Sequence, residues 1–385
     1  MLQIAVITPL FPIPQEPHRG IFIYRTVREL TRLAEVQVYC PVAVYPEWNW
    51  LKPRSYRSYR VDENYSPAGV EAKYLGYRTL PVAGRPVNGL LSGRKLLPWL
   101  RKRTPDVVLA YWIYPEGWGA LWAARRLGIP VVLGARGSDL RLPGDPLSAR
   151  LVRSALRRAS FLITVSEDLR RLAIQMGAAA ERTHSIPNGC ELGVFHPADR
   201  SRARLELGLK PESRVVLFVG RLVEVKGVRE LLRAARLLLA QHAWLEVVLV
   251  GEGPLRRPLE EQAAGELAAH VRFAGPQKPE AVARWMAAAD VVCLPSHSEG
   301  CPNVVIEALA CGRPVVASRV GGIPELVNSN CGILTPPQDP EALAAALHEA
   351  LNRAWETDFI AGQFRRGWDQ VAAETYQICR RAAGL

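Results

Sequence analysis

The sequence predicts an α/β protein of two domains, each a doubly wound parallel sheet covered by helices on both faces. Two observations support this fold class. Short apolar runs rich in β-branched residues alternate with longer helical patterns along all 385 residues, and a polar, proline-containing break divides the pattern near its middle. Continuous apolar runs are typical of parallel strands buried on both faces. Repeated strand-then-helix order builds doubly wound sheets.

The expected elements follow in chain order. Strands are predicted at Ile4–Thr8, Val36–Cys40, Val107–Ala110, Val131–Leu133, Phe161–Val165, Val215–Val219, Leu245–Val250, Val291–Leu294 and Val315–Ala317. The clearest helical patterns between them are Gly20–Ala34, Glu116–Leu127, Val228–Ala240 and Glu341–Leu351.

The break runs from Pro187-Asn188-Gly189 to Lys210-Pro211. We therefore expect two Rossmann-like domains, at residues 1–190 and 191–363, with a final helix at 364–385 that packs back on the first. Ligands of such sheets bind at the carboxyl ends of the strands, so the expected active site is a cleft between the two facing domains.

Charge is distributed unevenly between the two halves. Residues 1–190 hold 27 basic and 14 acidic side chains, whereas residues 191–385 hold 22 and 23. An anionic partner is therefore expected on the first domain. The seven cysteines include no CxxC pair, which favours free thiols in the cytoplasm. No apolar run reaches the ~18–20 residues of a spanning helix. We expect a cytoplasmic protein, with any membrane contact peripheral and on the inner face.

Several common fingerprints are missing: the GxGxxG and P-loop nucleotide motifs, the GxSxG elbow and the HExxH zinc helix. Cys293, His297 and Cys301 recur every four residues. They run from a strand into a loop, where helical spacing does not apply, so we expect no metal site.

The segment 298–308 carries two glutamates, Glu299 and Glu307, after the apolar run ending at Leu294. Pro302 favours a helix start, with Glu299 in the loop and Glu307 about one turn into the helix. Such a start suits a phosphate, while carboxylates suit sugar hydroxyls. The pattern thus describes a nucleoside diphosphate sugar site. Taken alone, it fits equally well a solvated Glu307 and a capping Glu299.

A second motif, Gly220-Arg221-Leu222-Val223-Glu224-Val225-Lys226-Gly227, follows the strand Val215–Val219. It puts two cations and a close-approach glycine beside another helix start, a combination that can neutralise a diphosphate. Either cation alone would read as a surface residue of a turn. Both motifs fall at the same edge of one predicted sheet, which favours a common site.

The two motifs together resemble the retaining glycosyltransferases of family 4, which have the GT-B fold. Further matching pieces are Arg19-Gly20, Arg136-Gly137-Ser138-Asp139, Val165-Ser166-Glu167, Ile186-Pro187-Asn188-Gly189 and Gly321-Gly322-Ile323-Pro324-Glu325. The opening Thr8–Pro12 with Arg19–Phe22 resembles members that build polysaccharides of the bacterial envelope.

The resemblance implies a catalytic set of Glu299, Arg221 and Lys226. The two cations would bind the donor diphosphate, Glu299 the hexose hydroxyls, and Glu307 the ribose hydroxyls. The rest of the donor site would be Gly20, Gly220, Gly300, Cys301, Pro302, Asn303 and Val304. No cofactor or metal is implied, because Arg, Lys and helix ends carry the leaving-group charge. A UDP-sugar is favoured as donor. Transfer would proceed with retention, by front-face attack in which the leaving phosphate takes the acceptor's proton.

The first domain departs from the family pattern. Tyr111 stands where many relatives carry a histidine, and Arg136-Gly137-Ser138-Asp139 stands where they often read His-Gly-x-Asp. We expect Tyr111, Arg136 and Asp139 to shape the acceptor site instead.

Two basic clusters lie in this domain, at residues 52–60 and 90–103. The second mixes leucines with Arg94, Lys95, Trp99, Arg101, Lys102 and Arg103. It is typical of a helix on an anionic membrane surface, although a core-facing helix with solvated cations would show the same composition. No nucleic-acid-binding module is present, and no nucleic acid partner is expected.

The sequence thus predicts an enzyme that moves a hexosyl unit from a nucleotide sugar to a lipid-linked or polysaccharide acceptor. Two alternatives stay open, a UDP-sugar epimerase on the same fold and a non-catalytic sugar-nucleotide-binding subunit.

Overall fold

The computed structural model describes residues 1–46, 62, 65–80, 84–137, 139–140 and 146–385. The chain divides into two compact units, which are considered separately below. Unit 1 comprises Met1–Asn188 and Trp368–Leu385, and unit 2 comprises Gly189–Gly367. The basic cluster at residues 52–60 lies outside the described residues.

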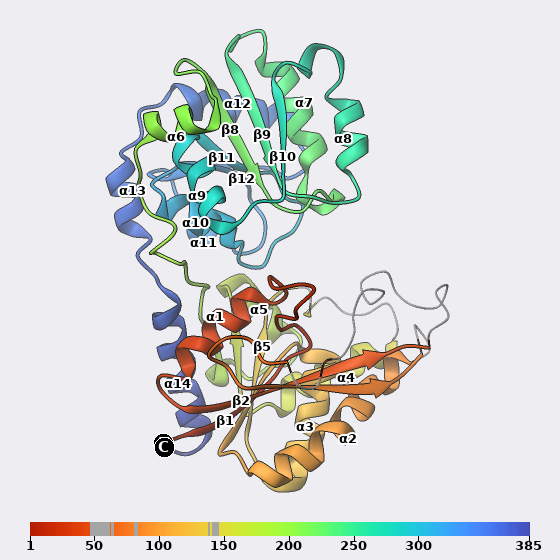
Figure 1. Ribbon diagram of the computed structural model, residues 1–385. Helices are drawn as coiled ribbons and strands as arrows, with labels where there is room; N and C mark the ends of the chain where they lie inside the picture. The colour runs from red at the N-terminus through yellow and green to blue at the C-terminus, as the bar shows by residue number, and fades with distance from the viewer. Residues whose placement is uncertain (47–61, 63–64, 81–83, 138, 141–145) are drawn as a thin grey trace. The chain divides into compact units, whose positions relative to one another are not determined.

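Unit 1 is built on a seven-stranded parallel sheet in the order β3-β2-β1-β4-β5-β6-β7 (Figure 1). Its strands are β1 (Gln3–Ile7), β2 (Glu35–Val44), β3 (Ala72–Arg78), β4 (Val107–Tyr111), β5 (Val131–Ala135), β6 (Phe161–Thr164) and β7 (Thr183–Ser185). Its helices are α1 (Ile21–Leu30), α2 (Arg85–Arg103), α3 (Trp118–Ala124), α4 (Pro146–Arg158), α5 (Glu167–Gln175) and α14 (Trp368–Ala382).

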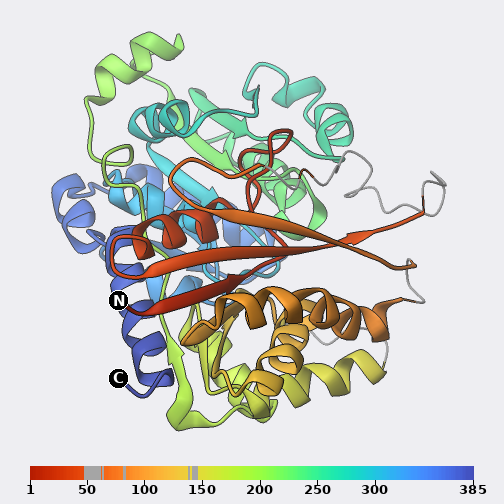
Figure 2. The same ribbon diagram turned by 60° about the horizontal axis from the view of Figure 1, so that its bottom comes forward.

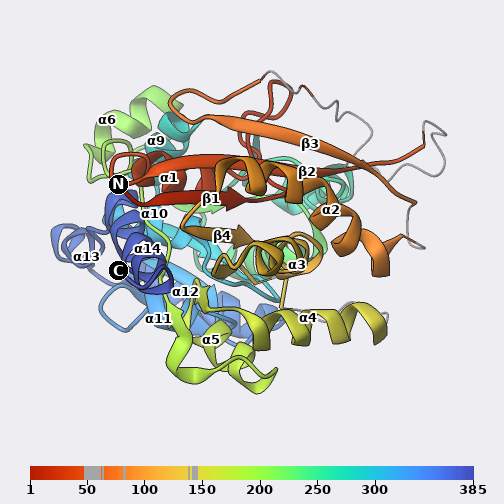
Figure 3. The same cartoon turned by 90° about the horizontal axis from the view of Figure 1, so that it is seen from below.

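The helices of unit 1 form layers on the sheet. Helices α2, α3 and α4 lie side by side, with α2 against α3 and α3 against α4 (Figure 3). Helix α1 packs against α14, which also contacts β4, β5 and β6. Figure 2 shows red α1 and gold α2 and α3 on opposite sides of the strands. The chain's last helix is therefore part of the first unit's layer structure.

Unit 2 has a six-stranded parallel sheet in the order β10-β9-β8-β11-β12-β13. Its strands are β8 (Arg214–Val219), β9 (Leu245–Val250), β10 (Val271–Gly275), β11 (Val291–Leu294), β12 (Val315–Ser318) and β13 (Gly332–Thr335). Its helices are α6 (Arg200–Leu207), α7 (Val228–Leu238), α8 (Arg256–Gln262), α9 (Pro279–Ala288), α10 (Asn303–Ala310), α11 (Ile323–Leu326), α12 (Pro340–Asn352) and α13 (Thr357–Gln363). The two parallel sheets confirm the predicted α/β fold class.

Nine strands match the apolar runs singled out in the sequence, and β3, β7, β10 and β13 are additional. These four are the edge strands of the two sheets. An edge strand has one neighbour and need not be buried throughout; every residue of β10, for example, is only partly buried. Its weaker apolar pattern therefore escapes a search for uniformly hydrophobic runs.

One predicted helix is divided in the structure. The pattern at 116–127 becomes a π-type turn at Ile113–Gly117, then α3, then a short 3₁₀ turn at Arg125–Leu127. Glycine at the boundary has a local cause, because a Cβ on Gly117 would lie 2.4 Å from the carbonyl oxygen of Trp112. The turn therefore brings residues 112–117 close together before the regular helix begins.

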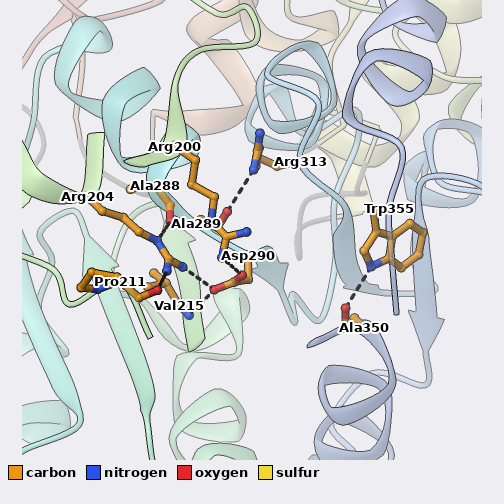
Figure 4. A network of polar contacts seen from close by, with 10 residues as sticks. All are labelled: Arg200, Arg204, Pro211, Val215, Ala288, Ala289, Asp290, Arg313, Ala350 and Trp355. Atoms are coloured by element: carbon orange, nitrogen blue, oxygen red, sulfur yellow. Dashed lines mark hydrogen bonds and ion pairs between the residues drawn. The ribbon is translucent and has the colours of Figure 1, made fainter. Parts of the chain in front are cut away.

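An ionic network around the buried carboxylate of Asp290 holds the amino ends of strands in unit 2 (Figure 4). Asp290 precedes β11 and accepts hydrogen bonds from the backbone N–H of Val215 and from Arg204 Nη2, both at 2.7 Å. Arg200 donates to the other carboxylate oxygen. Arg204 Nε also donates to the carbonyl oxygen of Ala288 at 3.0 Å. Because a buried charge must be paired and hydrogen-bonded, this network fixes α6 to the sheet.

Two features are absent from the described part of the chain. No helix there is long and apolar enough to pass through a bilayer. No group of three or more His, Cys, Asp or Glu side chains is arranged to hold a metal ion.

Candidate functional site

The loops that follow β8, β11 and β12 form the candidate site in unit 2. These three strands are neighbours in a parallel sheet, so their carboxyl ends lie along one edge. The loop after β8 carries Arg221 and Lys226, the loop after β11 carries Glu299, and the loop after β12 carries Gly321 and Gly322. The sheet order therefore brings together segments that are up to about 100 residues apart in sequence.

Glycines let these loops interlock through their backbones. Gly227 has φ 65°, and a Cβ there would lie 1.9 Å from the carbonyl oxygen of Pro295. His297 N–H donates to the carbonyl of Val225 at 2.8 Å. Gly227 therefore leaves no space for a side chain. The loop after β8 is thereby tied to the loop after β11.

A second pair of contacts ties the loop after β12 to the same place. Gly321 has φ 54°, and a Cβ on it would lie 2.0 Å from the carbonyl oxygen of Glu299. The N–H of Gly322 donates to the carbonyl of Gly300 at 2.9 Å. The backbone around Glu299 is therefore held from both sides.

The side chain of Glu299 receives two hydrogen bonds on one oxygen. Lys226 Nζ and Ser296 Oγ each donate to Glu299 Oε1 at 2.6 Å. The Glu299 side chain is 10% exposed and that of Lys226 is 24% exposed, while Ser296 is fully buried. The carboxylate is thus fixed in orientation at the edge of the sheet, and the lysine is fixed beside it.

The sequence assigned Lys226 and Glu299 to different groups of one ligand, and the structure joins them in one ion pair. Ser296 did not figure in the sequence analysis. The only clue to Ser296 in the sequence is its position, just after a buried strand and three residues before Glu299. The fold shows that its hydroxyl reaches the carboxylate of Glu299. His297 is directed toward α7, with Nε2 3.4 Å from Glu230 Oε1.

Arg221 takes no part in this ion pair. It is exposed, and among the described residues its guanidinium has neither a hydrogen bond nor an ion pair. Gly220 precedes it, at a point where a Cβ would touch the ring of Phe218 at 3.1 Å. Arg221 is therefore a solvated cation at the same sheet edge, available to a ligand phosphate.

Helix α10 begins beside the Glu299 loop. Its N-cap is Pro302, whose side chain cannot cap, and the first N–H groups of the helix have no side-chain acceptor from the cap residue. Pro302 is buried, whereas Asn303 and Val304 are partly buried. Cys301 and Val304 pack against the core of the unit. Glu307 is partly buried on the same helix, one turn from its start.

In unit 1, Gly20 closes the loop between β1 and α1. It has φ 59°, and a Cβ there would lie 2.2 Å from the carbonyl oxygen of Leu10. Arg19 Nη2 donates to the carbonyl of Pro9 at 3.4 Å, and Arg19 Nη1 to Glu16 at 3.3 Å. The glycine is thus required by close packing of the loop on itself.

Tyr111, Arg136 and Asp139 are brought together at the carboxyl ends of β4 and β5. The Arg136 guanidinium lies 5.0 Å from the centre of the Tyr111 ring and 4.8 Å from that of Phe22, and it donates to Asn188 Oδ1 at 2.6 Å. Asp139 accepts from the backbone N–H groups of Arg136 and Gly137. Burial raises the pKa of Tyr111.

Tyr111 and Asp139 are buried, with exposed fractions of 3% and 6%. Asp139 therefore shapes its own loop, and Tyr111 supports Arg136 through its ring face. Of the three residues, Arg136 is the partly exposed one.

Sequence reasoning missed Glu116, in the turn after β4. Its side chain is buried, and Oε2 has no hydrogen-bond partner among the described residues. Burial raises the pKa of this carboxyl to about 8. Trp112, four residues earlier, has φ 74°, which is unusual for a side chain of that size. The glutamate stands at the start of a predicted helix, and nothing in the sequence pattern distinguished it.

Helix α2 contains the basic cluster that suggested a membrane surface. Leu96 and Leu100 are fully buried, and the Trp99 ring lies 6.0 Å from that of Tyr39. Arg103 pairs with Glu35 at 3.2 Å and with Glu71 at 3.6 Å. The two leucines thus serve the core. Any membrane contact through α2 must rest on its exposed cations, Arg94, Lys95, Arg101 and Lys102.

Two family models match the chain. The model described as "Glycosyl transferase 4-like domain" matches residues 20–189, and the one described as "Glycosyl transferases group 1" matches residues 213–353. The first match ends one residue beyond Asn188, where the first segment of unit 1 ends, and the second match lies within unit 2.

Curated relatives align with most of the chain. TuaC of Bacillus subtilis (strain 168), named for teichuronic acid biosynthesis, is 30% identical over 357 residues, which are 90% of this chain and 88% of TuaC. A D-inositol 3-phosphate glycosyltransferase of Nocardioides sp. is 34% identical over 311 residues, covering 72% of this chain and 67% of that enzyme.

Solved structures share the fold. Anabaena Alr3699/HepE in complex with UDP superposes with a TM-score of 0.76 at 21% identity, covering 98% of this chain and 99% of that one. Sucrose-phosphate synthase from Thermosynechococcus elongatus superposes with a TM-score of 0.78 at 22% identity, covering 98% of both chains.

Proposed function

The chain belongs to the glycosyltransferases with the GT-B fold, and we propose that it transfers a hexosyl unit from a nucleotide diphosphate sugar, with retention of anomeric configuration. The observation that carries the proposal is the edge of the unit 2 sheet. There the Lys226–Glu299 pair, the exposed Arg221 and the start of α10, where Pro302 offers no side-chain cap, come together on interlocked loops.

Each group has chemistry that suits one part of such a donor. Arg221 and Lys226 supply cations for the diphosphate, and the backbone from Gly300 to Val304 supplies N–H groups at a helix start. Glu299 is a strong acceptor for hexose hydroxyls, and Glu307 for ribose hydroxyls. UDP is the favoured nucleotide, because HepE has been solved with UDP and with UDP-glucose.

The transfer step needs stabilisation of the leaving diphosphate. As the bond between the anomeric carbon and the phosphate oxygen breaks, negative charge grows on the diphosphate, beside Arg221, Lys226 and the start of α10. The acceptor hydroxyl forms its bond from the same face, and its proton passes to the leaving phosphate oxygen. This route requires no protein nucleophile and no divalent metal.

The acceptor is proposed to be a lipid-linked or polysaccharide chain. The name of TuaC supports this class, as does the excess of positive charge in residues 1–190. Arg136, held by Tyr111 and by the loop that Asp139 orders, is proposed as an acceptor contact. We further propose a cytoplasmic enzyme that meets an anionic membrane surface through the exposed α2 residues Arg94, Lys95, Arg101 and Lys102.

A donor panel tests the central proposal. Purified protein should bind and slowly hydrolyse at least one of a set of UDP-, GDP- and ADP-sugars. Glu299→Ala should abolish transfer while largely sparing binding of the bare nucleoside diphosphate. Glu266→Ala, an exposed glutamate of the same unit, is the matched control and should leave both unchanged. Failure of every donor, or equal loss of transfer and nucleotide binding in Glu299→Ala, would contradict the assignment.

The same assay separates the alternatives. An epimerase would convert donor to its epimer with no acceptor present. A non-catalytic subunit would bind donor but give no single-turnover transfer with membrane extract. Membrane contact is measured by flotation with anionic and zwitterionic vesicles. Only anionic vesicles should carry the protein, and Arg94→Gln with Lys95→Gln should reduce the floated fraction.

A further inference from the structure

A pocket lies on unit 1 between α3 and α4. It has a volume of about 330 Å³, and its walls include Trp118, Leu121, Trp122, Arg125, Arg126 and Arg158. Arg125 and Arg126 come just before β5, and Arg158 comes just before β6. These arginines therefore lie toward the amino ends of the strands, whereas Gly20, Tyr111 and Arg136 lie at the carboxyl ends.

The pocket is strongly cationic. Three guanidinium groups line it, and no carboxylate is among its lining residues. Arg125 and Arg158 are exposed, and neither makes a side-chain hydrogen bond or ion pair within the part of the chain that the structure describes. Helix α4 adds further exposed arginines and carries no acidic residue. An anion entering the pocket would therefore meet no carboxylate that repels it.

The third arginine is already held in place. Arg126 Nη1 donates to the carbonyl oxygen of Trp122 at 2.9 Å, and the guanidinium lies 3.7 Å from the centre of the Trp122 ring. Its remaining N–H groups keep a fixed fork for a carboxylate or phosphate. A pre-positioned arginine loses less side-chain entropy on binding than a mobile one.

The rest of the pocket is apolar and aromatic. Leu121 and Ala155 are buried beneath it, and Trp118 and Trp122 are partly exposed beside it. A free inorganic anion would use the arginines alone. A ligand that combines an anionic group with a ring bearing an apolar C–H face would also use the indole faces.

We propose that this pocket binds an acidic sugar unit of a carbohydrate chain, with the carboxylate or phosphate on the arginines and the sugar ring against Trp118 and Trp122. The pocket is a second carbohydrate site, separate from the site of transfer. Its occupancy is measurable without turnover. It would hold a distant segment of the same acidic glycan that the enzyme extends, if the proposed function is right.

Calorimetric titration of the full chain tests the proposal. The probes are a tetrasaccharide of alternating glucuronate and N-acetylglucosamine, neutral chitotetraose, and inorganic phosphate. The acidic tetrasaccharide should bind, phosphate should bind at least about tenfold more weakly, and chitotetraose should not bind measurably. The double variant Arg125→Gln, Arg158→Gln should weaken tetrasaccharide binding at least about tenfold, because each charge-assisted contact is among the stronger hydrogen bonds.

Arg153→Gln is the matched control. It removes one exposed arginine of α4 that does not line the pocket, and it should leave affinity unchanged. Hydrolysis of the donor sugar should be equal in all these variants, which separates this proposal from the transfer site. The proposal is overturned if the tetrasaccharide does not bind, or if Arg153→Gln weakens it as much as the double variant. A different result would be that phosphatidylglycerol vesicles displace the bound tetrasaccharide. If the double variant also lost affinity for these vesicles to the same extent as for the tetrasaccharide, the pocket would be assigned to lipid instead.

Discussion

Lys226 Nζ donates to Glu299 Oε1 at 2.6 Å, joining two residues 73 positions apart. The loops that carry them are also linked through the backbone, by Gly227 against Pro295 and by His297 N–H on Val225. The positions of the Lys226 and Glu299 side chains are therefore coupled, through their ion pair and through the backbone contacts of their loops.

The ion pair should behave as a unit in transfer. Lys226→Ala and Glu299→Ala are each expected to lower kcat/KM by at least about 100-fold, as loss of a transition-state contact does. The double variant should lose less than the product of the two, because the residues are in contact. The neighbouring pair Arg229–Glu224, at 3.3 Å, is the control, and its double replacement should leave kcat/KM unchanged. Independent effects of Lys226 and Glu299 would contradict the coupling.

Ser296 is expected to act as a positioning residue. Ser296→Ala removes one of the two hydrogen bonds to Glu299 Oε1 and leaves the lysine in place, so kcat should fall by about tenfold with little change in KM. Ser296→Thr restores a hydroxyl and should recover part of kcat. The measurement is steady-state kinetics with the donor that the panel of nucleotide sugars identifies. A rise in KM alone would show that the hydroxyl serves donor binding instead.

Gly227 should be intolerant of any side chain. Gly227 and Gly208 have the same backbone conformation, φ 65° and φ 64°, but a Cβ on Gly208 meets nothing within 4 Å. Gly208→Ala should therefore cost only the conformational strain of about 1–2 kcal/mol. Gly227→Ala adds the overlap with Pro295 and should cost roughly 3 kcal/mol or more in total. Urea unfolding of unit 2 compares the two variants, and equal costs would refute the close approach.

The His242–His348 pair should make unit 2 sensitive to acid. His242 Nε2 lies 2.9 Å from His348 Nδ1, and the pKa of His242 is lowered by burial first and then by the charges of His348 and Arg214. The unfolded chain takes up this proton near pH 6.5, before the folded protein does. The free energy of unfolding should therefore fall as the pH drops below about 6.5 toward the lowered pKa.

His242→Gln should flatten this part of the pH profile. His196→Gln, which changes an exposed histidine of the same unit, should leave the slope as it is. Chemical unfolding between pH 5 and pH 8 provides the measurement. An unchanged slope in His242→Gln would show that other groups cause the acid sensitivity.

Glu116 should oppose folding at neutral pH. Burial raises the pKa of its carboxyl from 4.5 to about 8. The unfolded chain ionises this group above pH 4.5, while the folded protein keeps it protonated. Its contribution to stability is thus full below pH 4.5 and is lost progressively as the pH rises to about 8. Glu116→Gln should stabilise unit 1 at pH 7 by about 1–3 kcal/mol, with little difference at pH 4.

The control for Glu116 is Glu181→Gln, in a glutamate whose side chain is 74% exposed. It should have no comparable effect at either pH. Thermal unfolding at pH 4, 5.5, 7 and 8 gives the profile. A destabilised Glu116→Gln at pH 7 would show that the carboxylate is charged and used in the folded protein.

Much of the candidate site could be predicted from the sequence, because its residues directly follow buried strands. Arg221 and Lys226 follow β8 and Glu299 follows β11, and the sheet order of a doubly wound fold places these ends together. The side-chain partners could not be predicted in this way. Ser296 and Glu116 are distinguished only by what surrounds them, which depends on packing between distant segments.

The same division holds for the fold. The sequence by itself determined the nine inner strands, the division into two sheets and the glycines at the loop contacts, because burial on both faces and positive φ each select a narrow set of residue types. Only the tertiary structure decided the four edge strands, the burial of Leu96 and Leu100 in α2, and the union of Lys226 with Glu299. Those outcomes depend on which surfaces meet, and no local pattern of residue types records that.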